Sequence, residues 1–283
     1  MDYAKGLNKT SIQTTDFTIS PVTGCLRGCS YCYARDLAET RLGKRYLANS
    51  IAIQPDPLRT SEAWEALWQR SHDDPFYPRL WTERAGPLRV SRNFRSRNSY
   101  LPQGSAMVFV VDMGDLFGPW LSDTLVRNIV SIMCRENRRH VLQFLTKYPE
   151  RLPEFNPWPH NAWVGATATR PGEVVGACQE LRRVYADVRY LSIEPMIGDQ
   201  WKHSDLVEDM DGVVDWVIIG QMTGRHASEA TRIDAKQLEP LVEQCERVGA
   251  RVFIKNNVHE GALVNLRRPL ETFPYTRTPR DGC

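Results

Sequence analysis

The sequence predicts an α/β protein built on a parallel sheet. Short apolar, β-branched segments alternate along the 283 residues with stretches whose apolar residues recur at helical spacing, which is the pattern of βα repeats. Val108–Val111 and Trp216–Ile219 are apolar at consecutive positions, as expected for strands buried on both faces of such a sheet. The sheet is expected to be barrel-like or doubly wound. Because about six or seven βα units exceed what a small open sheet needs, we favour a full or partial (β/α) barrel.

The expected strands and helices alternate over most of the chain. In the segment 121–136, apolar residues at Leu125, Ile129 and Met133 are close to helical spacing. A helix that begins near Pro171 and one that ends before Gly249 are favoured, because proline suits the start of a helix and glycine its end. The expected strands are Phe17–Val22, Met107–Asp112, Val141–Leu145, Ala162–Ala166, Val188–Ile193, Val214–Gly220 and Arg251–Ile254, and the expected helices are Leu121–Glu136, Pro171–Arg183 and Ala235–Val248.

Residues 52–103 interrupt this alternation. They contain a tryptophan-bearing helix candidate, Ser61–Arg70, followed by sequence rich in proline and arginine. We interpret this segment as an insertion after the first βα unit that covers one mouth of the barrel. The predicted barrel domain then comprises residues 1–257, and residues 258–283 form a C-terminal tail.

Composition places the chain among ordinary globular proteins. Hydrophobic residues make up 42% and charged residues 25%, so the chain can bury a core without metal support, and a metal site is expected to serve chemistry. No apolar run approaches the roughly 18 residues that cross a bilayer, and the N-terminus lacks the apolar stretch of a signal peptide. We therefore expect a cytoplasmic protein without a membrane partner. In that reducing compartment, the seven cysteines are expected to bind metal, react or pack rather than pair.

Arginines cluster in three places although the formal net charge is only +2. Such clusters are compatible with solvated surface and equally with contacts to nucleic-acid phosphates. The clusters are Arg89, Arg92, Arg95 and Arg97; Arg135, Arg138 and Arg139; and, in the tail, Arg267, Arg268, Arg277 and Arg280.

The most informative motif is a C-x3-C-x2-C array formed by Cys25, Cys29 and Cys32 directly after the first expected strand. Three thiolates within eight residues can surround one metal centre if the loop is flexible, and Gly24 and Gly28 permit unusual backbone angles there. A structural zinc site usually closes with four ligands, whereas three thiolates leave one position open. A [4Fe–4S] cluster bound in this way would have one iron free for another molecule.

Other interpretations of the array remain open. Zinc could bind with a distant fourth ligand such as Cys134 or His140. The three cysteines could also be unligated, whereas a disulfide within the loop is disfavoured by the reducing compartment.

The array resembles the signature of the radical S-adenosylmethionine (radical SAM) superfamily, with aromatic Tyr31 just before the last cysteine. Later segments resemble one branch, a phage- and prophage-associated family of largely unassigned function that is distantly similar to spore photoproduct lyase. The resemblance spans roughly residues 16–257. It rests on the segments Val111–Phe117, Phe144–Arg151, Trp163–Gly165, Leu191–Gly198, Trp216–Gly220 and Val252–Lys255.

The resemblance implies a partial (β/α) barrel of the radical SAM type that binds a [4Fe–4S] cluster and S-adenosylmethionine (SAM). Reductive cleavage of SAM would then yield a 5′-deoxyadenosyl radical that abstracts hydrogen from a substrate. An isomerase or lyase is implied, supplied with electrons by a donor such as flavodoxin or ferredoxin. In a barrel, the residues that act lie at the carboxyl ends of the strands.

Several strand-end residues are thereby assigned to cofactor binding. Asp115 would accept a hydrogen bond from the SAM amino group, with Gly114 leaving the backbone accessible; a turn with an Asx-type bond is the less favoured alternative. Lys147 would meet the SAM carboxylate, or it is a surface lysine. The hydroxyls of Thr167 and Thr169 would bind SAM or substrate, or cap the next helix. The predicted cofactor-binding residues are Tyr31, Met113, Gly114, Asp115, Thr146, Lys147, Thr167 and Glu194.

The predicted reacting and substrate-binding residues follow the last three strands. Glu194, just before Pro195, would bind the SAM ribose or the substrate, and with Lys255 it is the predicted catalytic pair. Substrate contacts are predicted for Gln221, Arg225 and Asn256. The segment Gln221–Arg225 departs from the family, in which a Gly-Glu-Ser-Gly-like stretch with a carboxylate is expected after Gly220, and this leaves the substrate class open.

The leading expectation is a radical SAM enzyme acting on nucleic acid, on a modified or damaged thymidine in phage or bacterial DNA. The enzyme would reach the base by flipping it or by acting on single strands. A radical SAM enzyme with a peptide or small-molecule substrate is a second possibility, although no separate peptide-recognition domain is evident. A third is a non-catalytic, zinc-bound nucleic-acid-binding protein.

Overall fold

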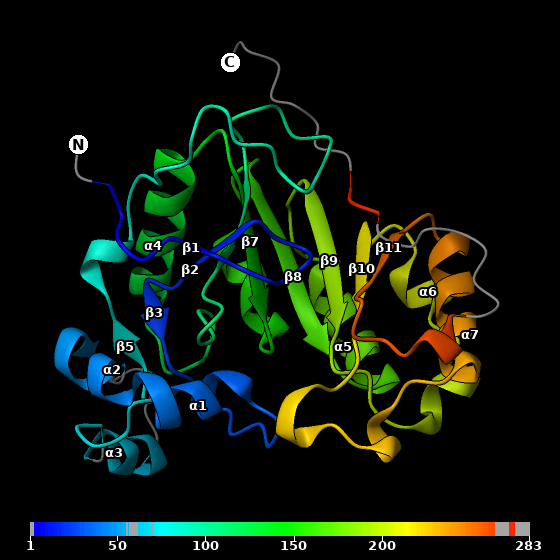
Figure 1. The fold of residues 1–283 in the computed structure, drawn as a ribbon, viewed down its shortest axis with the longest axis horizontal. Coiled ribbons are helices and arrows are strands. Elements are labelled where there is room, and N and C mark those ends of the chain that lie inside the picture. The colour runs from blue at the N-terminus through cyan, green and yellow to red at the C-terminus, as the bar shows by residue number, and fades with distance from the viewer. Residues whose placement is uncertain (1–2, 55, 57–61, 70, 264–271, 275–283) are drawn as a thin grey trace. The chain divides into compact units, whose positions relative to one another are not determined.

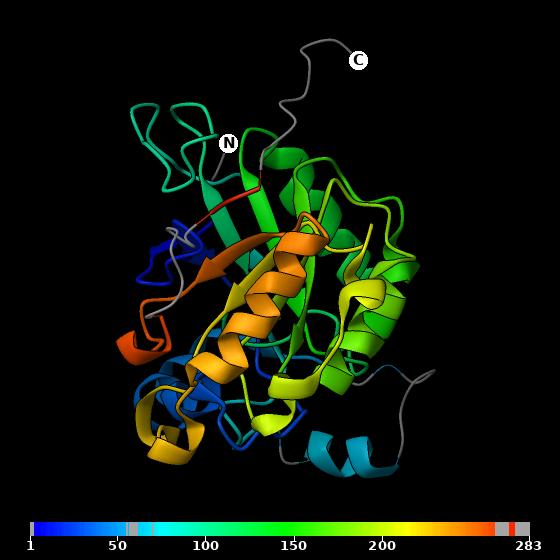
Figure 2. The same ribbon diagram turned by 90° about the vertical axis from the view of Figure 1, so that its right-hand side faces the viewer.

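The structure is a computed structural model that describes residues 3–54, 56, 62–69, 71–263 and 272–274 (Figures 1 and 2). The chain divides into two compact units. Unit 1 comprises Met1–Arg97 and Pro102–Arg151, and unit 2 comprises Asn98–Leu101 and Leu152–Cys283. Each contains parallel strands connected through helices, so the expected α/β class is confirmed. Among the helices in the described residues, none is both long and apolar enough to cross a membrane.

The main strands of unit 1 follow the order β1-β2-β6-β7. β2 (Phe17–Ile19) pairs in parallel with β6 (Met107–Val110), and β6 pairs in parallel with β7 (Val141–Thr146). Only β1 (Asn8–Lys9), which pairs with β2, is antiparallel. The parallel strands β2, β6 and β7 are almost entirely buried, which is why they are rich in apolar residues at consecutive positions, whereas the edge strand β1 is exposed.

Unit 1 also holds a small antiparallel sheet formed by three short strands. β5 (Arg79–Leu80) lies between β3 (Val22–Thr23) and β4 (Ile51–Ala52). The helical segments of this unit are α1 (Tyr33–Leu37), a π-turn (Ala38–Leu42), α2 (Gly43–Asn49), α3 (Glu62–Gln69), a 3-10 turn (Thr82–Arg84) and α4 (Asp123–Glu136), and a second 3-10 helix (Pro149–Phe155) runs on into unit 2.

Unit 2 contains four parallel strands with helices between them. Their order is β8 (Ala162–Ala168), β9 (Val188–Ile193), β10 (Trp216–Ile219) and β11 (Arg251–Ile254). Helix α5 packs on β8 and β9, and α7 packs on β11 (Figure 2). The helical segments are α5 (Pro171–Leu181), α6 (Val207–Met210) and α7 (Ala235–Arg247), with 3-10 turns at Asp199–His203, Gly224–His226, Glu229–Thr231 and Glu260–Ala262.

An aromatic cluster forms much of the unit 2 core. The Trp216 ring lies 5.6 Å from the rings of Trp163 and Tyr190 and 5.7 Å from that of Phe273, measured between centroids. Gly165 provides the room for Tyr190, because a Cβ at this glycine would lie only 2.6 Å from the Tyr190 ring. The sheet and this cluster therefore depend on a missing side chain in the middle of β8.

The expected strands and helices are all present, most of them with bounds that differ by one or two residues, and two of the differences have identifiable reasons. The expected strand Phe17–Val22 is two strands, because Pro21 has no N–H for the ladder and the chain beyond it pairs with β5 instead. The expected strand Met107–Asp112 ends at Val110, because Val111 adopts a φ of 67°, which no strand accommodates.

Other sequence predictions lie partly outside the described residues. In the insertion, the helix candidate Ser61–Arg70 corresponds to α3, while residues 61 and 70 are not described. Most of the tail 258–283, including its four arginines, is also outside the described residues. The assignment of residues 1–257 to one barrel domain stays a prediction.

We predict that Gly165→Ala destabilises the protein by about 1–3 kcal/mol, the usual cost of overpacking a core. The physical reason is the collision of the new methyl group with the Tyr190 ring. Urea unfolding measures the effect. Gly176→Ala is the matched control, since Gly176 lies in α5 with open space around its Cβ position. This control should leave the free energy of unfolding unchanged or raise it by up to about 1 kcal/mol, because alanine has a higher helix propensity than glycine. Equal effects of the two substitutions would contradict the packing argument.

Candidate functional site

The cysteine loop of unit 1 begins where three backbone segments meet. Gly24, with a φ of 87°, donates its N–H to the Met113 carbonyl at 2.8 Å and forms an isolated parallel bridge with Gly114. A Cβ at Gly24 would lie 2.3 Å from the Tyr77 carbonyl oxygen, and a Cβ at Gly114 would lie 2.6 Å from that of Gly24. Both positions therefore require glycine. The positive φ expected at Gly28 is also present, at 73°.

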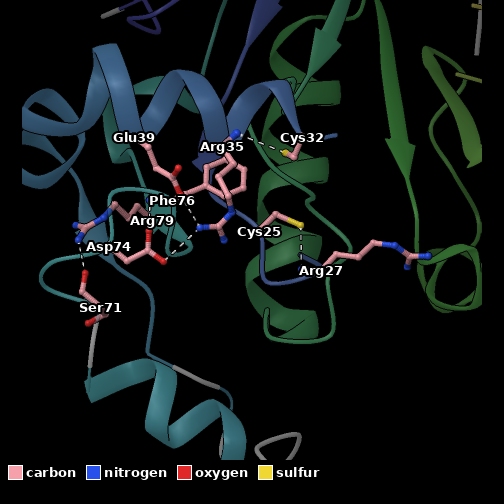
Figure 3. Close-up of polar contacts among 9 residues, drawn as sticks. All are labelled: Cys25, Arg27, Cys32, Arg35, Glu39, Ser71, Asp74, Phe76 and Arg79. Carbon is pink, nitrogen blue, oxygen red and sulfur yellow. Dashed lines mark hydrogen bonds and ion pairs between the residues drawn. The ribbon is translucent and has the colours of Figure 1, made fainter. Parts of the chain in front are cut away.

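Backbone N–H groups orient two of the three thiols (Figure 3). The Cys25 sulfur accepts from the N–H of Arg27, and the Cys32 sulfur accepts from that of Arg35, each at 3.4 Å. Cys32 is also the N-cap residue of α1. All three cysteines are half-buried, and none forms a disulfide.

The chemistry of this donor set fits a thiolate-bound metal or cluster. Burial, followed by the nearby Asp115 carboxyl, raises the pKa of Cys25 to about 12, and burial also raises the pKa of Cys32. Burial thus favours the protonated form of Cys25 and Cys32, and binding of a metal or cluster would displace the two protons. In the described part of the chain, no three His, Cys, Asp or Glu side chains are already arranged as a metal site.

Two side chains connect the loop to the end of β7. The Arg27 guanidinium donates to the Lys147 carbonyl at 2.8 Å and lies 4.9 Å from the centroid of the Tyr148 ring. The Lys147 ammonium lies 3.5 Å from the Tyr31 hydroxyl and 5.5 Å from the centroid of its ring. The predicted residues Tyr31 and Lys147 are thus brought together, while Arg27 was not predicted although it lies inside the cysteine motif.

Asp115 links the ends of β6 and β7. Its Oδ1 accepts from the Thr146 hydroxyl at 2.7 Å and from the Phe117 N–H at 3.0 Å, and its Oδ2 accepts from the Lys147 N–H at 2.9 Å. Burial raises the pKa of this carboxyl, and the hydrogen bonds oppose that shift. The predicted group Asp115, Thr146 and Lys147 is therefore a connected network, in which the carboxyl positions the two others.

The remaining predicted residue of this group, Met113, is a buried core residue. It belongs to a cluster that includes Tyr46, Phe76 and Trp81, against which Cys25 and Cys32 pack. The neighbouring Asp112 was not predicted. Its carboxyl accepts from the Ser20 hydroxyl at 2.5 Å, and its carbonyl accepts from the exposed Tyr33 hydroxyl at 2.6 Å.

In unit 2, the two predicted catalytic residues form an ion pair. The Lys255 Nζ lies 2.5 Å from the Glu194 Oε2, and their side chains are 15% and 27% exposed, so both groups are partly in contact with solvent. They follow β11 and β9, with β10 between them. Gly220, just after β10, leaves room for the carboxylate, because a Cβ there would lie 2.7 Å from Glu194 Oε1.

The other predicted residues of unit 2 make local contacts. Gln221 accepts from the Ile233 N–H at 3.0 Å, and its backbone exchanges hydrogen bonds with the Asn257 side chain. The exposed Arg225 contacts His226 at 3.2 Å. Asn256 is exposed in a turn, and Thr167 lies in β8 opposite Ser192.

Thr169 contacts the first turn of α5, but it is not the cap of the helix, since the N-cap residue is Arg170. Its hydroxyl and its backbone N–H both donate to Glu173 Oε2, at 2.9 and 2.7 Å. Glu173 lies in the first turn of α5. The threonine and the carboxylate therefore stabilise the beginning of this helix.

Cys134 and His140, the two residues considered as a fourth zinc ligand, are both buried in the protein. Cys134 is buried in α4. His140 accepts from the Ala106 N–H at 3.2 Å, and burial together with Arg139 lowers its pKa to about 4.

Some arginines of the predicted clusters support the fold. Arg97 donates to the carbonyls of Thr15 and Thr10, at 2.7 and 2.8 Å, and Arg139 donates to that of Val90 at 3.0 Å. Arg92 and Arg95 are exposed.

The family described as "Protein of unknown function (DUF5131)" matches residues 9–264. The chain belongs to this family. The DUF5131 match includes the cysteine loop, both strand-end groups and every predicted site residue from Cys25 to Asn256, and it ends before most of the tail. No curated protein and no solved structure matches the chain.

We predict that Gly220→Ala uncouples Glu194 from Lys255. The new methyl group would displace the carboxylate, which is the flexible end of its side chain. In an otherwise unchanged chain, a double-mutant cycle with Glu194→Gln and Lys255→Met should give a coupling free energy of about 1 kcal/mol. The same cycle in the Gly220→Ala background should give a value near zero. Urea unfolding provides all eight stabilities, and equal coupling in the two backgrounds would refute this role of Gly220.

Proposed function

We propose that this chain is a radical SAM enzyme whose [4Fe–4S] cluster is held by Cys25, Cys29 and Cys32. The observation that carries the proposal is the anchoring of the three-thiol loop in unit 1. Its first residues are fixed against Gly114, and Arg27 and Tyr31 contact Lys147. A loop with three thiols and no fourth ligand among its own residues is the donor set that a cluster with one open iron needs. A partial (β/α) barrel of the radical SAM type is part of the proposal.

When bound, the cluster and SAM would supply a 5′-deoxyadenosyl radical for hydrogen abstraction from the substrate. The residues of the chain then bind and orient. The Lys147 ammonium is suited to pair with the SAM carboxylate, and Asp115 fixes the backbone that bears it. Glu194 and Lys255 provide an acceptor and a donor of protons that are already in hydrogen-bond contact.

For the substrate we propose a nucleic acid, a modified or damaged thymidine in DNA, on which the enzyme acts as an isomerase or lyase. The exposed Arg92 and Arg95 support contacts to phosphates, in addition to the arginines of the tail. Binding to single-stranded DNA should then weaken steeply with salt. A peptide or small molecule is the alternative substrate, and binding that is absent or independent of salt favours it.

We predict that the reconstituted protein shows a reduced [4Fe–4S] EPR signal that SAM perturbs, and that it forms 5′-deoxyadenosine. Anaerobic reconstitution with iron and sulfide, reduction and addition of SAM provide the test. Cys29→Ala should abolish both results, because the loop then offers only two thiolates. Cys134→Ala is the matched control, since it removes a buried cysteine of α4 outside the loop, and it should leave both results unchanged.

The same preparation can contradict the proposal. A colourless protein that binds zinc in a one-to-one ratio and never cleaves SAM would favour a non-catalytic, nucleic-acid-binding protein. Equal loss of the cluster in Cys29→Ala and Cys134→Ala would show that the loop is not the specific binding site.

A further inference from the structure

A short turn of the insertion, Asp74–Tyr77, contacts both ends of the cysteine loop (Figure 3). At one end, the Cys25 N–H donates to the Phe76 carbonyl at 3.1 Å. At the other end, the Arg35 guanidinium lies 4.9 Å from the centroid of the Phe76 ring. Arg35 is also the residue whose N–H donates to the Cys32 sulfur. One residue of the insertion thus contacts both segments that carry these two thiols.

Asp74 holds the turn in shape. Its Oδ1 accepts from the Phe76 N–H at 2.7 Å, and its backbone carbonyl accepts from the Tyr77 N–H at 3.2 Å. Its Oδ2 lies 3.9 Å from the Arg35 guanidinium. Because Asp74 and Arg35 are both about one-third exposed, this ion pair alone contributes little, and the hydrogen bond to Phe76 is the main contact.

The base of the turn is closed by a buried arginine. The Arg79 guanidinium, almost fully buried, donates to the Ser71 carbonyl at 2.6 Å. Phe76 itself is 2% exposed and packs in the same cluster as Cys25 and Cys32. The turn is therefore held by hydrogen bonds at its base and its tip and by the packing of its core residue, Phe76.

We propose that Asp74–Tyr77 is a clamp that sets the separation of Cys25 and Cys32, with Asp74 as a positioning residue that donates no ligand. The insertion would then take part in loading the cofactor, in addition to the expected role of covering one mouth of the barrel. The inference deepens the proposed function and rests on it for the identity of the bound group. The contacts themselves belong to the protein without the cluster.

The first test uses the apoprotein, so that it does not depend on any cluster. In reduced apoprotein, iodoacetamide alkylation of Cys25 and Cys32, followed by mass spectrometry, should be about tenfold faster in Asp74→Ala than in the unchanged chain. Asp74→Asn retains an Oδ1 acceptor for the Phe76 N–H and should restore the slow rate. That recovery separates the turn geometry from the loss of charge.

Glu39→Gln is the matched control. Glu39 is a second carboxylate on Arg35, at 3.1 Å, and its side chain is about half exposed, so its substitution tests the charge beside Arg35 without changing the Asp74 side chain. Its substitution should leave both alkylation rates unchanged. A thermal melt of each variant shows that the fold is retained. If Asp74→Ala does not fold, Arg35→Met decides instead, because it removes the guanidinium that lies over Phe76 and should expose Cys32.

The second test uses reconstituted protein and measures loss of iron to a chelator. Asp74→Ala should lose iron about tenfold faster than Glu39→Gln and Asp74→Asn. Unchanged alkylation and iron loss in Asp74→Ala would overturn the clamp. If the unchanged chain assembles no [4Fe–4S] cluster, the proposed function fails, and the alkylation rates still decide whether the clamp exists.

Discussion

The close approach of three backbone segments at Gly24 is the constraint on which the rest of unit 1 depends. The chain leaving β3, the chain leaving β6 and the turn before β5 pass each other with no space for a side chain at Gly24 or Gly114. Two main-chain hydrogen bonds connect the three segments: the Gly24 N–H donates to the Met113 carbonyl, and the Cys25 N–H donates to the Phe76 carbonyl. Because backbone atoms move less freely than side chains, the first thiol is placed by the fold itself. The insertion that supplies the third segment is therefore part of the site.

A second constraint is the burial of Asp115. An unpaired buried carboxylate is costly, and here three donors from two neighbouring strand ends compensate it. The same bonds fix the backbone of Lys147, whose carbonyl in turn receives Arg27 of the cysteine loop. The buried carboxyl is thus connected to the cysteine loop through Lys147 and Arg27. These contacts explain why the end of β7 lies beside the cysteine loop.

Much of this could be predicted from the sequence because it depends on local patterns. Strands that are buried on both faces must be apolar at consecutive positions, and a loop that holds one metal centre must bring its thiols close in sequence. Residues at the carboxyl ends of parallel strands must share an edge, which placed Glu194 and Lys255 together. Contacts without a local pattern were missed. The sequence around Asp74 has no pattern that indicates a contact with Cys25, which is almost fifty residues away. A second example is Val111, whose β-branched side chain favours a strand although its backbone is left-handed and ends β6.

The structure also separates two kinds of predicted polar residue. Asp115, Thr169 and Gln221 direct their side chains to partners within the protein, and these bonds account for them without a ligand. Lys147 and the pair Glu194–Lys255 are only half-buried, so part of each polar group faces solvent. A charged pair kept at this depth gains little stability, since surface screening limits its attraction while its partial desolvation is unfavourable. The missing side chain at Gly220 leaves the room in which the Glu194 carboxylate meets Lys255, and this arrangement supports the proposed contact of the pair with a ligand.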